Sequence, residues 1–264
     1  MTMLGSEPSS VHFPDSAEVP ESTWHFELRS LIYDFLTLAF GNVAAIGCDQ
    51  FVYWDPSNPR ACLSPDAFLC FGAKDEHFRS WKVWERGVPH VAVEIVSDSD
   101  ASELSWDEKL DRYRCLGVSE LVWFDAESPA HPLRIWDLVG DHLLERRLLE
   151  PCAQSRLLGG YWLPIEEPNG GLTLRLSRDE AGLSLFPTLA EYNADRLCEE
   201  AEARRMEAEA RRTEAEARRT EAEARRTEAE ARRIAEESLR RETDARRAAE
   251  QRIVELEAEL KRRS

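Results

Sequence analysis

Asp66, Glu94 and Lys109 are the residues of this chain whose types and order could serve one reaction. Asp66 follows a proline, Glu94 interrupts an apolar run, and Lys109 lies on an expected helix downstream. Mg²⁺ takes oxygen ligands, usually one or two carboxylates, and keeps several waters. The ion lowers the pKa of a bound water, and a nearby amine can orient that water or stabilise developing negative charge. The three side chains therefore predict metal-dependent phosphodiester cleavage.

In this interpretation Asp66 and Glu94 hold Mg²⁺ or Mn²⁺, and Lys109 positions the attacking water. A glutamate buried in a strand is costly unless it is paired or bound to a metal, which favours a functional role for Glu94. Pro-Asp also begins ordinary turns, and most lysines lie on the surface, so a structural reading stays open for Asp66 and Lys109. No ligand-like spacing is found, and no role is assigned, for the histidines His25, His77, His90, His131 and His142.

A sheet and a helix must bring the three residues together. The nearly continuous apolar run 88–97 predicts a central buried strand with Glu94 in its middle. The segment 61–71 predicts a strand with Asp66 inside it or at its start. Residues 106–116 predict a helix that ends at Gly117.

The remaining pattern completes an α/β domain. Helical spacing is seen over 24–40, and strand-like segments follow at 43–54, 120–125, 133–139, 143–149 and 159–176. The segments 133–139 and 143–149 predict a hairpin. An order of helix, strands, helix and strands predicts a mixed sheet flanked by helices.

The C-terminal part is a different kind of sequence. Beyond residue 188 it predicts one long helix with EAEARRT heptads, in which Glu207 and Arg211 form the first of several helix-stabilising pairs. Ala and Thr make a poor seam, so a solvated single helix and a coiled coil both stay open. Ile253, Leu256 and Leu260 supply a dimerising stripe, which predicts a homo-oligomer formed through this helix. The predicted division is a disordered lead-in over 1–22, a folded domain over 23–187 and a charged helix over 188–264.

The charge is unevenly distributed along the chain. The formal net charge is −17, and residues 199–264 contain 19 acidic and 18 basic residues, so −16 falls on residues 1–198. This acidity counts against DNA binding, because proteins that bind DNA normally present a basic face.

Cysteine usage and hydropathy bear on location. The six cysteines include no CxxC pair and no nearby histidine, which predicts reduced, mostly buried thiols in a cytoplasmic protein without a zinc site or disulfides. No apolar run approaches the ~20 residues that a membrane span requires, so no membrane association is expected.

The chain resembles the Uma-type family of restriction endonucleases, which belongs to the PD-(D/E)XK nuclease superfamily. The resemblance is carried by Pro65-Asp66, Glu94-Ile95-Val96-Ser97, Lys109, Tyr113 and Gly117-Val118-Ser119-Glu120. It covers residues 24–176 and implies a restriction-endonuclease-like fold. It also implies Mg²⁺-dependent endonuclease activity on DNA, with Asp66 and Glu94 at the metal and Lys109 as a catalytic group.

The chain also departs from the family pattern. The lysine of the superfamily usually follows the glutamate by two residues, where this chain has Val96. The resemblance implies that the amine has moved to the following helix, as Lys109. Tyr113, one turn later, is assigned either to the core or to bracing the site, and Glu27 either to a solvated face or to an additional carboxylate.

Two further interpretations stay open. The domain could be an inactive nuclease fold that works as a binding or scaffold protein and self-associates through its C-terminal helix, which the acidic charge and the repeats favour. It could also act on RNA or a nucleotide.

Overall fold

The computed structural model describes residues 22–74, 76–96, 105–148, 152–168 and 170–263. The chain forms two compact units, Met1–Ala194 and Asp195–Ser264, which are described separately below. The predicted disordered lead-in lies outside the described residues except for Ser22, so its disorder stays a prediction.

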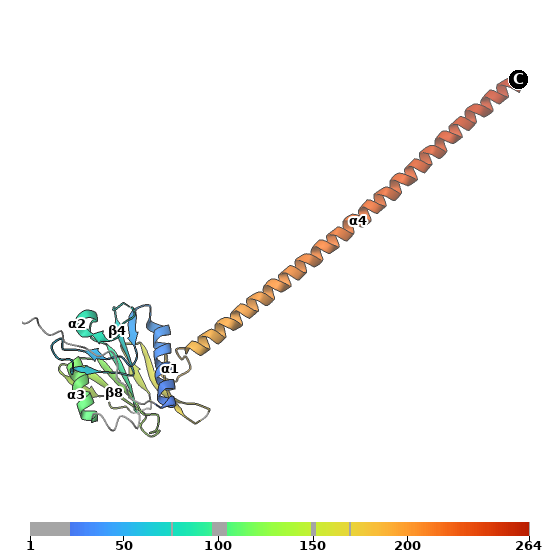
Figure 1. Ribbon diagram of the computed structural model, residues 1–264. Helices are drawn as coiled ribbons and strands as arrows, with labels where there is room; N and C mark the ends of the chain where they lie inside the picture. The colour runs from blue at the N-terminus through green and yellow to red at the C-terminus, as the bar shows by residue number, and fades with distance from the viewer. Residues whose placement is uncertain (1–21, 75, 97–104, 149–151, 169, 264) are drawn as a thin grey trace, which may run out of the picture. The chain divides into compact units, whose positions relative to one another are not determined.

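A six-stranded mixed sheet is the centre of the first unit (Figure 1). Its strands follow the order β1 (Ala44–Gly47), β4 (Ala67–Phe71), β6 (Val91–Ile95), β7 (Glu120–Phe124), β8 (Leu133–Val139) and β9 (His142–Glu145). The pair β6–β7 is parallel and the other pairs are antiparallel. The predicted fold class, a mixed sheet with flanking helices followed by a long C-terminal helix, is confirmed.

Strand β6 is buried along its whole length, as its apolar sequence predicts. It has two strands on one side and three on the other. Hydrogen bonds from His90 N to Leu69 O and from Val96 N to Phe124 O extend its pairing by one residue at each end. Glu94 is thus a carboxylate in the interior of the sheet.

Helix α1 (Thr23–Phe40) covers one face of this sheet. Its buried residues Leu28, Ile32, Phe35 and Leu36 recur at helical spacing and pack against β1, β4 and β6. Ser22 caps the helix, because its Oγ accepts a hydrogen bond of 3.1 Å from the backbone N–H of His25.

Helix α3 (Trp106–Leu116) covers the opposite face and connects the parallel strands β6 and β7 (Figure 1). A capping box begins it: Ser105 Oγ accepts from Glu108 N, and the Glu108 carboxylate accepts from Ser105 N. Gly117 ends it with φ 84°, a left-handed conformation that favours glycine. The helix predicted for 106–116 is confirmed.

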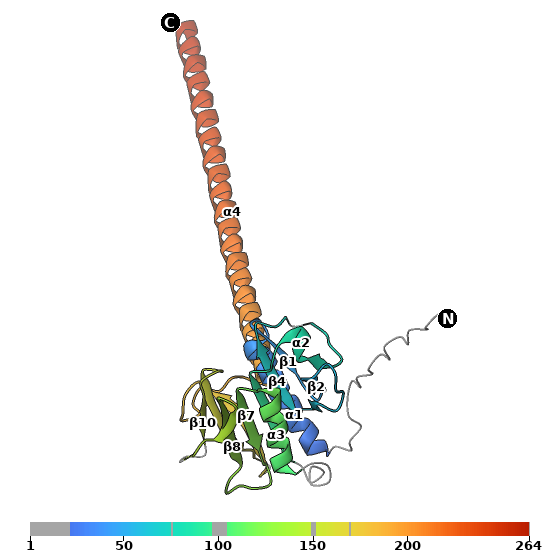
Figure 2. The ribbon, with the colours of Figure 1, turned by 90° about the vertical axis from the view of Figure 1, so that its left-hand side faces the viewer.

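Two small sheets complete the unit, and Figure 2 shows them well separated at β2 and β10. The strands β10 (Ala153–Ser155), β11 (Gly160–Glu166) and β12 (Leu172–Ser177) share a core with α1. The strands β3 (Cys62–Leu63), β2 (Val52–Tyr53) and β5 (Trp81–Lys82), with the short helix α2 (Val83–Arg86), share a core with α3.

The segments 43–54 and 61–71 were each predicted as one strand, and both predictions are wrong. Each segment contributes one strand to the large sheet and one to a small sheet. The first breaks near Asp49, whose φ of 56° is incompatible with an extended strand. The second breaks at Pro65, which has no N–H for a ladder and whose carbonyl accepts a hydrogen bond from Asp49 N.

The expectation of mostly buried cysteines is also wrong. Of the six cysteines, only Cys70 is buried. Cys115 and Cys198 are exposed, because they lie on the outward face of α3 and on the solvated helix α4. The apolar character of cysteine alone therefore does not predict which of these side chains are buried.

Helix α4 (Leu189–Arg263) has 75 residues, which correspond to about 110 Å of helix. Side chains 189–257 are all exposed. The predicted pairs are present: Arg211, Arg218, Arg225 and Arg232 each lie 2.6–2.7 Å from the glutamate four residues earlier. Such pairs support an isolated helix. Neither α4 nor any other described helix is both long and apolar enough to cross a membrane.

A buried ion pair joins the large sheet to β11. Glu120 is 1% exposed, and its Oε2 lies 2.8 Å from Arg146 Nη2, while its Oε1 accepts a hydrogen bond of 3.1 Å from Trp162 Nε1. Arg146 also binds Asp137 and the carbonyl of Gln154. One guanidinium therefore compensates a carboxylate that water cannot reach.

We predict that Arg146→Met lowers the free energy of unfolding by about 3–5 kcal/mol, because Glu120 would keep a buried charge without its partner. Urea unfolding measures the change. The neighbouring Arg147, for which the described ranges contain no side-chain hydrogen bond or ion pair, provides the control. Arg147→Met should change stability by less than about 0.5 kcal/mol. Equal effects of the two substitutions would contradict the prediction.

Candidate functional site

Asp66 immediately precedes β4, and Glu94 lies on the neighbouring strand β6. The register pairs Ala67 with Val93, so continuing it by one residue pairs Asp66 with Glu94. Directly opposite side chains have Cβ atoms about 5 Å apart. Asp66 is 7% exposed and Glu94 is 5% exposed. Two nearly buried carboxylates therefore lie close together where β4 begins beside β6.

Asp66 is held by the next strand and by α1. Its Oδ2 accepts a hydrogen bond of 2.7 Å from the backbone N–H of Ile95. Its Oδ1 lies 3.2 Å from His25 Nε2, and the same nitrogen lies 3.2 Å from the backbone oxygen of Ile95. The first turn of α1 thereby reaches the ends of β4 and β6.

Glu94 is held by two residues of α3. Lys109 Nζ lies 3.1 Å from its Oε2, and the hydroxyl of Tyr113 donates a hydrogen bond to its Oε1. Lys109 and Tyr113 are four residues apart, so they lie on the same face of the helix. The structure therefore brings the three predicted site residues together. Tyr113 is both fully buried and bonded to Glu94, so it combines the two roles considered for it.

Sequence reasoning missed His25. It lies 41 residues before Asp66 and 70 before Ile95. Its neighbours in the sequence carry no motif, and only the packing of α1 brings it to the site. Glu27, the other candidate on the first helix, is exposed. This agrees with its alternative assignment to a solvated face. Ser97 lies outside the described residues.

The charged form of Glu94 is disfavoured even with Lys109 beside it. Its pKa is raised from 4.5 to about 7, mainly by burial and also by the like charge of Asp66, while Lys109 and Tyr113 act in the opposite direction. The protein thus retains a glutamate whose charged form is costly. Strongly perturbed carboxyl groups of this kind concentrate at functional sites.

The donor atoms fit a hard divalent cation. Asp66 and Glu94 offer carboxylate oxygens, and one or two carboxylates with several waters are the usual protein ligands of Mg²⁺. A dication would also offset the repulsion that raises the pKa of Glu94. Within the described ranges, no group of three or more His, Cys, Asp or Glu side chains is arranged to hold a metal. The site would therefore rely on two carboxylates, backbone oxygen and water.

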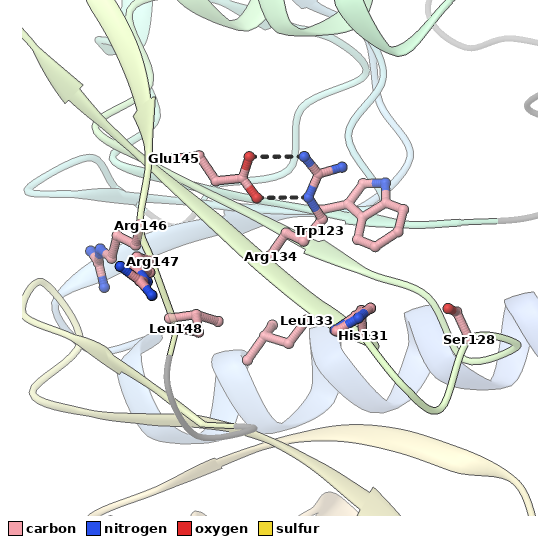
Figure 3. A pocket seen from close by; sticks show the side chains of 9 residues that line it. All are labelled: Trp123, Ser128, His131, Leu133, Arg134, Glu145, Arg146, Arg147 and Leu148. Carbon is pink, nitrogen blue, oxygen red and sulfur yellow. Dashed lines mark hydrogen bonds and ion pairs between the residues drawn. The ribbon is translucent and has the colours of Figure 1, made fainter.

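A cleft lies next to the site, and two of the residues that line it are cross-strand neighbours in line with Glu94. The register places Trp123 opposite Glu94, and Arg134 opposite Trp123. The cleft has a volume of about 460 Å³ and also includes His131 and Arg147 in its lining (Figure 3). Figure 3 shows the guanidinium of Arg134 facing the Glu145 carboxylate, with two contacts of 2.8 Å.

Arginines gather here despite the acidity of the unit. A neighbouring cavity of about 880 Å³ shares Arg146 and Arg147 with the cleft and adds Arg156. Arg147 and Arg156 are exposed, and the described residues provide no ion pair for either. A net charge of −16 over residues 1–198 therefore coexists with a local group of cationic side chains.

Comparison with known proteins assigns no family. No protein-family model matches the chain, and no curated protein matches it. One solved structure that matches is a protein of Anabaena variabilis described as a "putative nuclease belonging to DUF820". The two are 11% identical, the match covers 53% of this chain and 76% of the other, and the TM-score is 0.40. A similarity of this size is too weak to assign a family, substrate or catalytic residue, so membership of the Uma-type family stays a prediction.

We predict that the metal-free protein becomes less stable as the pH rises from about 4.5 to about 7. The folded protein keeps the Glu94 proton over this range, whereas the unfolded chain releases it. Glu94→Gln cannot ionise and should remove this part of the pH dependence, with a gain of up to roughly 3 kcal/mol above pH 7. Urea unfolding in EDTA at pH 5 and pH 8 measures both proteins. If the wild type and Glu94→Gln differ in the free energy of unfolding by the same amount at both pH values, ionisation of Glu94 does not destabilise the fold.

Proposed function

We propose that the first unit is a metal-dependent endonuclease that hydrolyses phosphodiester bonds in DNA. The observation that carries this proposal is the pair of nearly buried carboxylates, Asp66 and Glu94, in contact with one lysine. A structural ion pair would need one carboxylate and one cation. Here a second carboxylate, Asp66, adds repulsion that raises the pKa of Glu94, and a bound dication would offset it.

Each residue has a distinct part in this proposal. Asp66 and Glu94 would hold Mg²⁺ or Mn²⁺, which when bound supplies an activated water and charge neutralisation at the phosphate. Lys109 would orient the attacking water through its N–H groups and would stabilise the negative charge that develops on the phosphate. Tyr113 would fix the Glu94 carboxylate through its hydroxyl, because it is buried and cannot reorient freely.

An exposed arginine of the cleft supports a polyanionic substrate. Arg147 lines the cleft that includes Trp123, the residue opposite Glu94 on β7. A cationic side chain in this place would contact phosphates and would not take part in the chemistry. DNA as the partner and the cytoplasm as the location both belong to the proposal.

Plasmid cleavage with Mg²⁺ or Mn²⁺ tests the proposal. We expect cutting that EDTA stops and that Glu94→Gln abolishes, because the variant removes a metal ligand. Lys109→Met should reduce the rate about 100-fold or more while metal binding is retained. Lys74→Met provides a matched control, because the Lys74 side chain is 86% exposed and should not affect the rate.

Undiminished cutting by the Glu94→Gln variant would end the assignment of Glu94. Cleavage of single-stranded RNA but not of DNA would favour the reading as a ribonuclease. Absence of both cutting and metal binding would favour a scaffold.

The scaffold reading has one observation of its own. Ile253, Val254 and Leu256 of α4 are 45–64% exposed in the single chain, so they are available to a second copy. Self-association through the end of α4 is therefore the second candidate function, with the domain as a binding module.

For this candidate we predict a dimer or larger assembly in light scattering, and a return to monomer in Leu256→Glu. Leu183→Glu provides the control, because Leu183 is 89% exposed and lies outside α4. A strict monomer at high concentration would exclude self-association.

A further inference from the structure

The cleft drawn in Figure 3 has no part in the chemistry assigned to the carboxylate pair. Its volume of about 460 Å³ falls in the range of sites that hold one small molecule. Trp123, which lines it, is the β7 neighbour of Glu94, and adjacent strands lie about 4.8 Å apart. The cleft therefore begins one strand from Glu94, and a molecule bound at Glu94 can extend into it.

The cleft has one positive charge without a partner. Arg134 is paired with Glu145 through two contacts of 2.8 Å, and Arg146 lies 2.8 Å from Glu120. Arg147 is exposed, and within the described ranges its side chain has no hydrogen bond or ion pair. Because a guanidinium group binds phosphate oxygens through pairs of N–H groups, Arg147 suits an anionic ligand such as a phosphate.

Two aromatic rings line the same cleft. Trp123 is half-buried, and the guanidinium of Arg134 lies 5.4 Å from the centre of its ring. His131 is exposed in the turn between β7 and β8, where its backbone N–H donates a hydrogen bond of 3.1 Å to Ser128 O. Nucleic acid bases stack on histidine as well as on the larger aromatic side chains. His131 therefore offers the accessible stacking surface, and Trp123 supplies apolar contact beside it.

A base can use this surface only when it is unstacked. In a duplex each base is covered on both faces by its neighbours, so it must leave the helix before a side chain can stack on it. A single strand presents its bases without that cost. The cleft therefore distinguishes the two forms of a nucleic acid.

We propose that the cleft binds one unstacked nucleotide, with its base against His131 and Trp123 and its phosphate on Arg147, and that the protein prefers single-stranded to fully paired DNA. The net charge of −16 over residues 1–198 acts in the same direction, because it repels two phosphate strands more than one. The nucleotide as ligand follows from the chemistry of the cleft. Its place in a DNA substrate rests on the proposed function.

Binding in EDTA tests the inference without any reference to cleavage. Isothermal titration of the full-length chain compares deoxyadenosine monophosphate with deoxyadenosine and with inorganic phosphate. We expect the nucleotide to bind roughly tenfold more tightly, or better, than either part, because both the base and the phosphate contribute. Fluorescence anisotropy then compares a labelled single strand with its blunt duplex, and we expect the single strand to bind more tightly by a similar factor.

Arg147→Met and His131→Ala remove the two contacts separately. We expect each to weaken binding of the nucleotide and of the single strand about 5- to 100-fold. Arg147→Met should also reduce the slope of log affinity against log salt by about 0.7, whereas His131→Ala should leave it unchanged. Arg156→Met and His142→Ala are the matched controls, because both residues are exposed and neither lines the cleft. Thermal unfolding verifies that the variants fold, and the comparisons made with the wild type do not depend on them.

Four outcomes overturn the inference alone: no binding of the nucleotide, inorganic phosphate bound as tightly as the nucleotide, a duplex bound as tightly as the single strand, or equal effects of Arg147→Met and Arg156→Met. None of them affects the proposed nuclease, because the measurements involve neither the metal nor Glu94. Nucleotide binding that depends on Arg147 and His131, in a protein that neither cuts DNA nor binds a metal, would end the nuclease proposal and leave the nucleotide site.

Discussion

The pairing of β4 with β6 imposes the constraint on which the rest of the site depends, because it brings Asp66, which directly precedes β4, close to Glu94 of β6. Asp66 and Glu94 cannot both ionise there without cost, since burial and mutual repulsion act in the same direction on the pKa of Glu94. The surrounding structure limits this cost. The backbone N–H of Ile95 binds Asp66, while α3 supplies an ammonium group and a hydroxyl to Glu94.

The two helices contribute from opposite faces of the sheet. Helix α3 crosses from β6 to β7 on the side of Glu94, so a helical pair four residues apart can reach one carboxylate. Helix α1 lies on the other side, and only its first turn passes the strand end to reach Asp66. Its core contacts and its cap keep that turn in place. The same packing that stabilises the fold therefore completes the site.

The local distribution of charged side chains in this protein cannot be read from its net charge. The first unit is strongly acidic, yet arginines collect along β8 and the chain that follows β9. One of them, Arg146, forms an ion pair with the buried Glu120, which also accepts a hydrogen bond from Trp162 of β11. Arg147 and Arg156 are exposed and line the cavity next to this ion pair. In α4 the balance is reached within each heptad, because every repeated glutamate has an arginine one turn later.

The sequence by itself determined most of the elements and pointed to Asp66, Glu94 and Lys109 as one candidate site. The apolar run around Glu94, the capped helix before Gly117 and the charged repeats each depend on local spacing, so the mixed sheet, α3 and α4 were predictable. Only the tertiary structure decided that 43–54 and 61–71 each divide between two sheets, and that His25 joins Asp66. Those features depend on contacts between residues far apart in the chain. Local periodicity carries no information about such contacts. Asp49 N bonds to Pro65 O where the two segments divide, and the packing of α1 against the sheet brings His25 to Asp66.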